Sequence, residues 1–478
     1  MSDSLKQRAV KGVAWTAIDQ ATYIGLNFVI GVILARMLSP EEFGLLAMIA
    51  VFNAIAQAFL DSGFGAALIR KPEIQESDRS TAFYFNIIAG VVLFGVLFLA
   101  APLIAQFYKQ PILTGLVRWE GFLLVIAGFN IVQQAQLTRD LRFKAKAIIR
   151  ASSTLLSGLA GIAAAFKGAG VWSLVIMHIA FNAVSLVMLW VFSPWRPRSG
   201  WSRDSFRYLW GFGSKMLASS VIDRIYGQIY PMVIGKFFSA ASLGQYSRAS
   251  QYAQLPSHTV TNVLQQVTFP VLSKMQDDNE RLGVNYRRIL RFSAFVVFPV
   301  MLLMAALAKP MVVVLVTDKW LPCVPYLQLI CLASMWFPVH AINLNLLQVK
   351  GRSDLFLRLE IIKKLIVTVV MFCSIPFGII GMCAGRIFTS LVCLAINTYY
   401  TGKLINVGFF MQMRDLLPTF VNSLIMGVIV YVAVMPLANL WLQLILGILV
   451  GAAYYLAAAY VLRLPELKEV VKIISRKP

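Results

Sequence analysis

IIAGVVLFGVLFLAAPLIA, from Ile87 to Ala105, contains no polar or charged side chain. A run of this length crosses the hydrocarbon core of a bilayer as one α-helix, which needs about 20 apolar residues. Similar runs recur along all 478 residues, of which 59% are hydrophobic and 13% charged. They lack the alternating pattern of membrane β-strands, and helices satisfy their own backbone groups in lipid. The sequence therefore predicts an all-α polytopic membrane protein of about fourteen transmembrane helices.

The basic residues are distributed as in an inner-membrane protein. The chain holds 43 Lys and Arg against 21 Asp and Glu, which gives a net charge of +22. Most of the basic residues lie in alternate loops and at the chain ends, whereas the intervening loops hold few, such as Lys109, Lys167 and Lys309. Positively charged loops stay in the cytoplasm, so we predict a bacterial inner-membrane protein with both termini cytoplasmic. No nucleic-acid-binding module is present, which argues against nucleic acid as a partner.

The sequence shows no motif of an enzyme or a metal site. P-loop, HExxH and nucleophile-elbow patterns are missing, and the five cysteines lack metal-ligand spacing. The three histidines, His178, His258 and His340, are scattered and are expected to be buried and hydrogen-bonded. We therefore predict a transporter rather than an enzyme, with no cofactor and no metal. Glu120 and Arg118 are expected at the outer membrane interface.

Two segments align at an offset of 200 residues: VILARMLSPEEFG, Val32 to Gly44, and MVIGKFFSAASLG, Met232 to Gly244. Six predicted spans separate them, so both enter the membrane in the same sense, as in parallel repeats about an axis along the membrane normal. We predict two six-helix lobes around a central cavity, residues 1–200 and 201–405. Residues 406–478 hold two extra C-terminal helices and a cytoplasmic tail.

Charged side chains inside the membrane mark the predicted site, because each costs about 2.5–3.5 kcal/mol at mid-bilayer on insertion scales. In the second lobe, Arg224, Arg248 and Lys215 are the candidate substrate-binding residues. They belong to polar helix faces that also carry Asp223, Gln228, Gln251, Tyr252 and Asn262. Arginine binds phosphate through two parallel hydrogen bonds, so a basic cavity wall favours an anionic, phosphate-bearing substrate.

The first lobe offers a second polar wall that is acidic or neutral. Asp19, Tyr23 and Asn27 share a face of the first helix, and Gln57 and Asp61 share a face of the second with Asn53. We predict that these residues line the cavity. A purely structural arrangement is the alternative, in which Asp223 neutralises a neighbouring charge and Arg224 pairs with Asp19 or Asp61.

Several longer stretches carry a resemblance to a known family. They are KGVAWTAIDQ from Lys11, LARMLSPEEFGLLAM from Leu34, DSGFGAALIRK from Asp61, FPVLSKMQDD from Phe269 and DKWLPCVPYLQLICL from Asp318. With them the chain resembles the polysaccharide-transport branch of the multidrug/oligosaccharidyl-lipid/polysaccharide exporter superfamily, the Wzx-type flippases of the colanic-acid kind.

The resemblance implies a fourteen-helix, two-lobe flippase that works by alternating access. Its implied substrate is an undecaprenyl-pyrophosphate-linked oligosaccharide repeat unit, carried to the periplasmic leaflet for exopolysaccharide or O-antigen assembly. Family arginines in helices 7 and 8, here Arg224 and Arg248, are implied to contact the pyrophosphate and sugars. Lipid II flippases of the superfamily carry arginine in helix 1, whereas this chain has Asp19, which argues against a peptidoglycan role.

Two other functions compete with the flippase. A cation-coupled multidrug or metabolite antiporter of the same superfamily would use Asp19 and Asp61 as coupling acids, but such exporters usually have twelve spans. A membrane polymerase or acyltransferase would be expected to carry a large outer loop, and the outer loops here are short. We expect the lipid bilayer and polysaccharide polymerase machinery as partners, and a functional monomer because of the internal symmetry.

Overall fold

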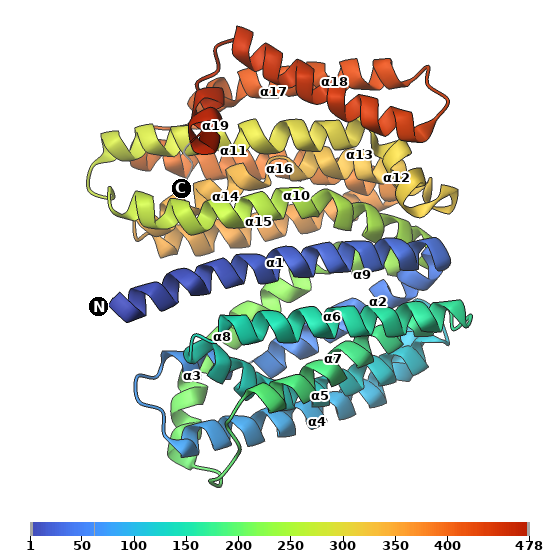
Figure 1. The fold of residues 1–478 in the computed structure, drawn as a ribbon, viewed down its shortest axis with the longest axis vertical. Helices are drawn as coiled ribbons and strands as arrows, with labels where there is room; N and C mark the ends of the chain where they lie inside the picture. Colours follow the sequence, from blue (N-terminus) through green and yellow to red (C-terminus); the bar gives the residue numbers. More distant parts are fainter. Residues whose placement is uncertain (1–2, 62, 476–478) are drawn as a thin grey trace. The chain divides into compact units, whose positions relative to one another are not determined.

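The computed structural model of the protein is built from helices joined by short loops (Figure 1). It describes residues 3–61 and 63–475, except the side chains of residues 3–11, 13, 212, 215, 216, 218, 219, 267, 470, 471 and 473–475. Within this described part no β-strand forms. The prediction of an all-α membrane protein is confirmed, and its physical reason is that a helix satisfies every internal backbone group without help from solvent.

The contacts divide the chain into two compact units, Met1–Gly244 and Gln245–Pro478. The first unit holds α1 (Asp3–Met37), α2 (Pro40–Asp61), α3 (Phe64–Arg70), α4 (Glu76–Tyr108), α5 (Leu113–Arg139), α6 (Phe143–Phe166), α7 (Trp172–Phe192), α8 (Arg203–Gly227) and α9 (Ile229–Phe237). The contact division therefore falls later in the chain than residue 200, because α8 packs against α2, α3 and α4. The lobe boundary at residue 200 stays a prediction.

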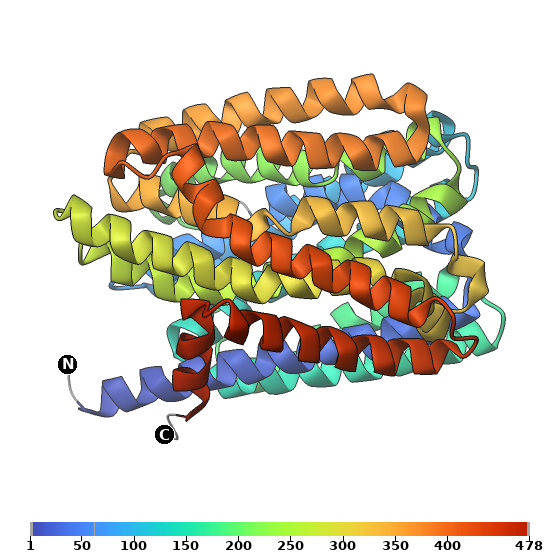
Figure 2. The same cartoon turned by 90° about the horizontal axis from the view of Figure 1, so that it is seen from above.

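The second unit contains the remaining helices, with the first turn of α10 still in the first unit. They are α10 (Ala240–Ser273), α11 (Asn279–Ala306), α12 (Ala308–Val316), η1 (Asp318–Trp320), α13 (Cys323–Ser334), α14 (Phe337–Val349), α15 (Ser353–Ser374), η2 (Ile375–Phe377), α16 (Gly378–Ile405), α17 (Phe409–Val434), α18 (Leu440–Val461) and α19 (Pro465–Ser475). Here α17 packs along α11 and α18, and the short α19 turns away from α18 (Figure 2).

Eleven helical stretches among the described residues are long and apolar enough to cross a membrane. One of them, Ser353–Ile405, contains both α15 and α16. The polar α8, α9 and α10 are not among the eleven. The sequence predicts one span at about residues 207–237, over α8 and α9, and another at about 243–271, within α10. The chain is thus a multi-pass membrane protein, and the count of fourteen stays a prediction.

The two segments that align in the sequence have matching helix ends. α1 ends at Met37 and α9 at Phe237, while α2 begins at Pro40 and α10 at Ala240, so both boundaries repeat at the offset of 200 residues. The starts of α2 and α10 touch at glycines: a Cβ on Gly44 would lie 1.7 Å from the carbonyl oxygen of Ala240. Only a residue without a side chain allows this approach of two helix backbones.

Close backbone packing also joins α4 to α5, which lie side by side in the first unit (Figure 1). A Cβ on Gly90 would lie 2.7 Å from the carbonyl oxygen of Leu124, and one on Gly128 would lie 2.6 Å from that of Asn86. Each helix therefore presents a glycine to the backbone of the other. This contact fixes α5, which carries part of the site described below.

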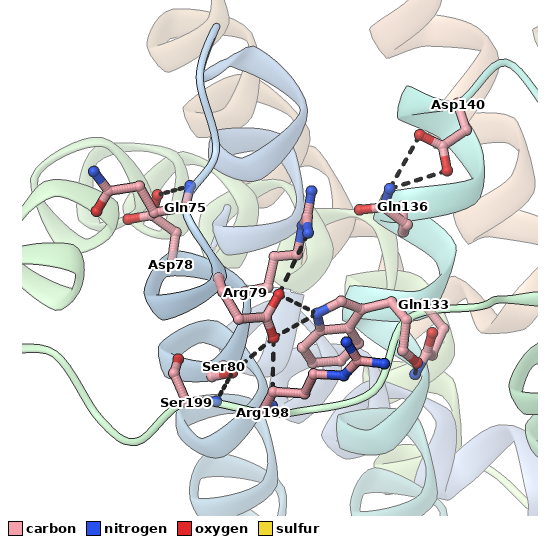
Figure 3. A network of polar contacts seen from close by, with 11 residues as sticks. Gln75, Asp78, Arg79, Ser80, Gln133, Gln136, Asp140, Arg198 and Ser199 are labelled. Carbon is pink, nitrogen blue, oxygen red and sulfur yellow. Dashed lines mark hydrogen bonds and ion pairs between the residues drawn. The ribbon is translucent and has the colours of Figure 1, made fainter.

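A polar network attaches residues 193–202, the linker between α7 and α8, to the start of α4. The Glu76 carboxylate accepts hydrogen bonds from the Trp195 indole nitrogen at 2.9 Å and from the Arg198 backbone nitrogen at 3.4 Å. The Ser199 backbone nitrogen donates to the Ser80 hydroxyl at 3.4 Å (Figure 3). Ser202 then caps α8 by accepting a hydrogen bond from the Ser205 backbone nitrogen. The network thus sets where α8 begins.

Candidate functional site

The first unit has an open cavity of about 490 Å³ between α2, α5, α7 and the end of α8. Its wall is mostly apolar with a few polar groups, the usual make-up of a ligand site. The lining residues are Phe43, Leu46, Ala47, Ile49, Ala50, Asn53, Ala54, Gln57, Glu120, Leu123, Leu124, Ala127, His178, Asn182 and Arg224. Two of the predicted site residues, Gln57 and Arg224, are therefore brought to one cavity.

Arg224 faces Asp61 at this cavity, with 3.7 Å between Nη2 and Oδ2. Both residues stand at helix ends, because α2 ends at Asp61 and Arg224 lies in the last turn of α8. A cation is favourable at a helix C-terminus and an acid is not, so the guanidinium offsets an otherwise unfavourable carboxylate. About half of each side chain is exposed, at 52% for Arg224 and 49% for Asp61. Such an open pair is weak, and Arg224 can exchange Asp61 for another anion.

A second pair in the same wall joins α5 and α7. The Glu120 carboxylate lies 2.8 Å from His178 Nδ1, and the Asn53 amide donates to its other oxygen at 3.4 Å. Only 5% of the Glu120 side chain is exposed, whereas His178 is 38% exposed. Glu120 is thus buried in the cavity wall, and its position at the outer membrane interface stays a prediction. Sequence reasoning missed this pair because Glu120 and His178 lie on different helices, although an acid in an apolar helix was a usable signal.

Asp19, Tyr23 and Asn27 lie where α1 packs on α6, and they are not among the residues that line the cavity. Arg150 of α6 lies 3.2 Å from the Asp19 carboxylate and stacks on the Tyr23 ring at 3.5 Å. The Asn27 amide donates to the Tyr23 backbone carbonyl at 2.9 Å. The polar face of α1 that the sequence predicts is therefore occupied by a basic partner, Arg150, which sequence reasoning did not single out.

Arg248 lies within the second unit, where only 5% of the residue is exposed. Its guanidinium carbon is 5.4 Å from the centre of the Trp320 ring and 5.8 Å from that of Tyr252. It also donates a hydrogen bond to the Gln251 side chain at 3.0 Å. Two predicted partners, Gln251 and Tyr252, are thus found beside Arg248, in a packed aromatic setting that favours a cation.

The remaining predicted residues are distributed along the same helices. Asp223 is exposed next to Arg224, Gln228 lies at the break between α8 and α9, and Asn262 is exposed further along α10. Lys215 lies on α8, but its side chain falls outside the described residues. Among the described residues no group of three or more His, Cys, Asp or Glu could hold a metal ion.

A second polar cavity, of about 630 Å³, lies in the second unit between α11, α17 and the region of α19. Four of the five charged side chains in its wall form two ion pairs, and Arg414 is the fifth. Arg287 donates two hydrogen bonds of 2.6 Å to the Asp415 carboxylate, and Arg291 lies 3.2 Å from the Glu466 carboxylate. A bidentate pair such as Arg287–Asp415 holds helices in a defined geometry. The two pairs therefore join α17 and the start of α19 to α11.

The sequence matches that of known proteins over most of its length. The model of a family described as "Polysaccharide biosynthesis protein" matches residues 33–325. The teichuronic acid biosynthesis protein TuaB of Bacillus subtilis (strain 168) is 25% identical over 95% of this chain and 95% of its own length. The lipopolysaccharide biosynthesis protein WzxC of Escherichia coli (strain K12) is 26% identical over 81% of this chain and 80% of its own length.

The fold matches a solved transporter. The lipid II flippase MurJ in its inward closed conformation aligns with a TM-score of 0.77 over 94% of this chain and 98% of that chain. Sequence identity is 16%, so the likeness concerns the fold alone. The family match and the similarity to WzxC confirm the resemblance to polysaccharide-transport proteins that the sequence motifs predicted.

Proposed function

Because this chain belongs to the family of polysaccharide biosynthesis proteins, we propose that it is a flippase for a polyprenyl-diphosphate-linked oligosaccharide. It carries the repeat unit, linked to undecaprenyl pyrophosphate, from the cytoplasmic to the periplasmic leaflet of the bacterial inner membrane, and it does so by alternating access. Both termini are cytoplasmic in this proposal, in line with the distribution of basic residues between loops. The reaction is transport, with no bond made or broken.

The observation that carries the proposal is the open pair of Arg224 and Asp61 at the 490 Å³ cavity. A diphosphate headgroup offers more negative charge than one carboxylate, so it can replace Asp61 on Arg224. The long Arg224–Asp61 distance of 3.7 Å and the exposure of both side chains keep the cost of that exchange small. Outward movement of each negative charge is further favoured by about 2.3 kcal/mol per 100 mV of membrane potential.

The antiporter alternative finds less support. Its proposed coupling acids, Asp19 and Asp61, are each paired with an arginine, Arg150 and Arg224. Arg150 neutralises Asp19, which is therefore a poor site for a transported cation. Asp61 can bind a cation only after Arg224 has left it, so the two pairs favour the flippase over an antiporter that uses these acids.

The test is a reconstituted flipping assay. The full chain is placed in liposomes with a fluorescent short-chain polyprenyl diphosphate that carries N-acetylglucosamine, and dithionite reduces the probe in the outer leaflet. We expect the whole probe pool to become accessible, against about half in empty liposomes. A correctly folded protein that leaves accessibility at the level of empty liposomes, with both this probe and a longer glycan, would overturn the proposal.

A further inference from the structure

Glu120 and His178 form a buried acid–imidazole pair that the proposed flippase function does not use. The carboxylate lies 2.8 Å from Nδ1 of the imidazole, and α5 and α7, the two helices that carry them, pack together. An ionised carboxylate with 5% exposure needs a partner that neutralises it, and the histidine provides one only while it carries a proton. The charge of the pair therefore depends on how many protons it holds.

Access to the pair runs through the cavity. Both residues line the cavity, and His178 is the more exposed of the two, at 38% against 5% for Glu120. Nδ1 contacts Glu120, and among the described residues Nε2 has no hydrogen-bond partner. A proton that enters from the cavity therefore reaches the imidazole first and the carboxylate second. Histidine is also the side chain whose ordinary titration falls between pH 5 and 8.

The other charged groups on the neighbouring helices are engaged elsewhere. Arg118 of α5 stacks on Phe98 of α4 at 4.2 Å, and Arg150 of α6 is held by Asp19. From α8 the charged Arg224 lines the cavity, and Asp61 at the end of α2 is its ion-pair partner without being a lining residue. α2 otherwise contributes the neutral Asn53 and Gln57, and α3, α4 and α6 contribute no lining residue.

We propose that Glu120 and His178 form a proton-binding site in the wall of this cavity, which takes up a proton when an anionic headgroup binds at Arg224. Without a proton on the imidazole the pair carries one negative charge, and with one the pair is neutral. A phosphate-bearing ligand in the same cavity favours the neutral form, since a unit charge at about 8–10 Å changes proton affinity roughly tenfold. By linkage, the ligand then binds more tightly at low pH. The ligand part of this inference rests on the proposed function.

The first experiment tests proton binding without any ligand. The chain has three histidines, so the His258→Asn/His340→Asn variant, labelled with ¹⁵N-histidine in detergent, reports His178 alone. We expect the ring to titrate between pH 5 and 9, and Glu120→Gln to shift its midpoint by one pH unit or more. A ring that keeps one protonation state over this range, or a midpoint unchanged by Glu120→Gln, would overturn the proton site.

The second experiment tests the linkage to an anion, with farnesyl diphosphate as the probe. Calorimetry in two buffers of different ionisation enthalpy measures proton uptake on binding, which we expect to approach one proton at pH 7.5. Binding should be about tenfold tighter at pH 6 than at pH 8. Glu120→Gln and His178→Gln should each remove both effects, whereas Glu466→Gln, a buried paired acid in the second unit, should keep them.

The outcomes separate the two proposals. Binding of the probe without proton uptake overturns the linkage and leaves the flippase intact. Absence of binding by a folded protein whose His178 titrates with Glu120 counts against the diphosphate substrate, while the proton site stands. Thermal unfolding in detergent shows whether each variant still folds. The results for Glu120→Gln and His178→Gln are interpreted together.

Discussion

Gly44 and Gly244 make reciprocal contacts at the start of α2 and of α10. A Cβ on Gly44 would lie 1.7 Å from the carbonyl oxygen of Ala240, and a Cβ on Gly244 would lie 1.8 Å from that of Pro40. The four residues form two pairs at the offset of 200 residues that the sequence alignment suggests. The contact thus joins equivalent positions of the two aligned segments.

We expect Gly44→Ala and Gly244→Ala each to lower the stability of the protein, because a methyl group at this place collides with backbone that cannot move aside. Overpacking of this kind costs roughly 1–3 kcal/mol. The measurement is the thermal unfolding midpoint in detergent. Gly95→Ala is the matched control, since a Cβ there meets nothing within 4 Å. Equal midpoints for the Gly44 and Gly95 variants would show that the helix starts are not in close contact.

Arg224→Ala should reduce flipping of the diphosphate probe by at least tenfold, because the cavity loses the cation that would hold the headgroup. Arg224→Lys should retain part of the rate, since a lysine keeps the charge but not the paired donors. Asp61→Asn should tighten probe binding, as it removes the competing carboxylate. Arg414→Ala, an exposed arginine of the second unit, is the control. An unchanged rate for Arg224→Ala would remove this residue from the site.

Arg248 can act either on the substrate or on the packing of the second unit, and its variants distinguish the two roles. Stacking between Trp320 and Tyr252 and a buried position predict that Arg248→Ala costs about 2 kcal/mol of stability. The measurement pairs the thermal midpoint with probe affinity. A fall in affinity at an unchanged midpoint would assign Arg248 to the substrate, and a fall in the midpoint alone would assign it to packing.

Glu76→Ala should loosen residues 193–202, because the carboxylate accepts hydrogen bonds from both Trp195 and Arg198. We expect trypsin to cut after Arg198 several times faster than in the unchanged protein, as measured by mass spectrometry of the fragments. Gln136→Ala removes a hydrogen bond to Asp140 on the same unit and should leave the cutting rate unchanged. Equal cutting rates for all three proteins would mean that the linker is held by other contacts.

The fold could be predicted from the sequence because it follows from local properties. Long apolar runs predict helices in lipid, and Pro40 and Ala240 begin helices at equivalent positions because the two segments share their pattern. Breaks inside predicted spans were missed: α2 gives way to α3 near Gly63, whose φ is 75°, and α8 ends before α9 at Gln228. Hydropathy averages over such breaks, so it carries no signal for them.

The site could be predicted only in part. Intramembrane charge singled out Arg224 and Asp61 one by one, and their pairing was among the alternatives. It did not reveal that Arg150 pairs with Asp19, nor that Glu120 meets His178, because helical periodicity gives the face of a residue but not the helix opposite it. Which residues pair between helices depends on the tertiary fold, and a single sequence does not reveal which helices become neighbours.

The break at Gln228 divides one predicted span into two helices, α8 and α9. α9 leads directly to the crowded glycine contact, while α8 carries Arg224. The two helices meet at Gln228, a non-helical residue whose backbone bonds to the Arg224 carbonyl on one side and to the Met232 nitrogen on the other. An unbroken helix would transmit any tilt of one half to the other, whereas a broken one bends there at low cost. We therefore expect Gln228 to act as a hinge. Arg224 can then move with α8 while the contact at Gly44 and Gly244 stays in place.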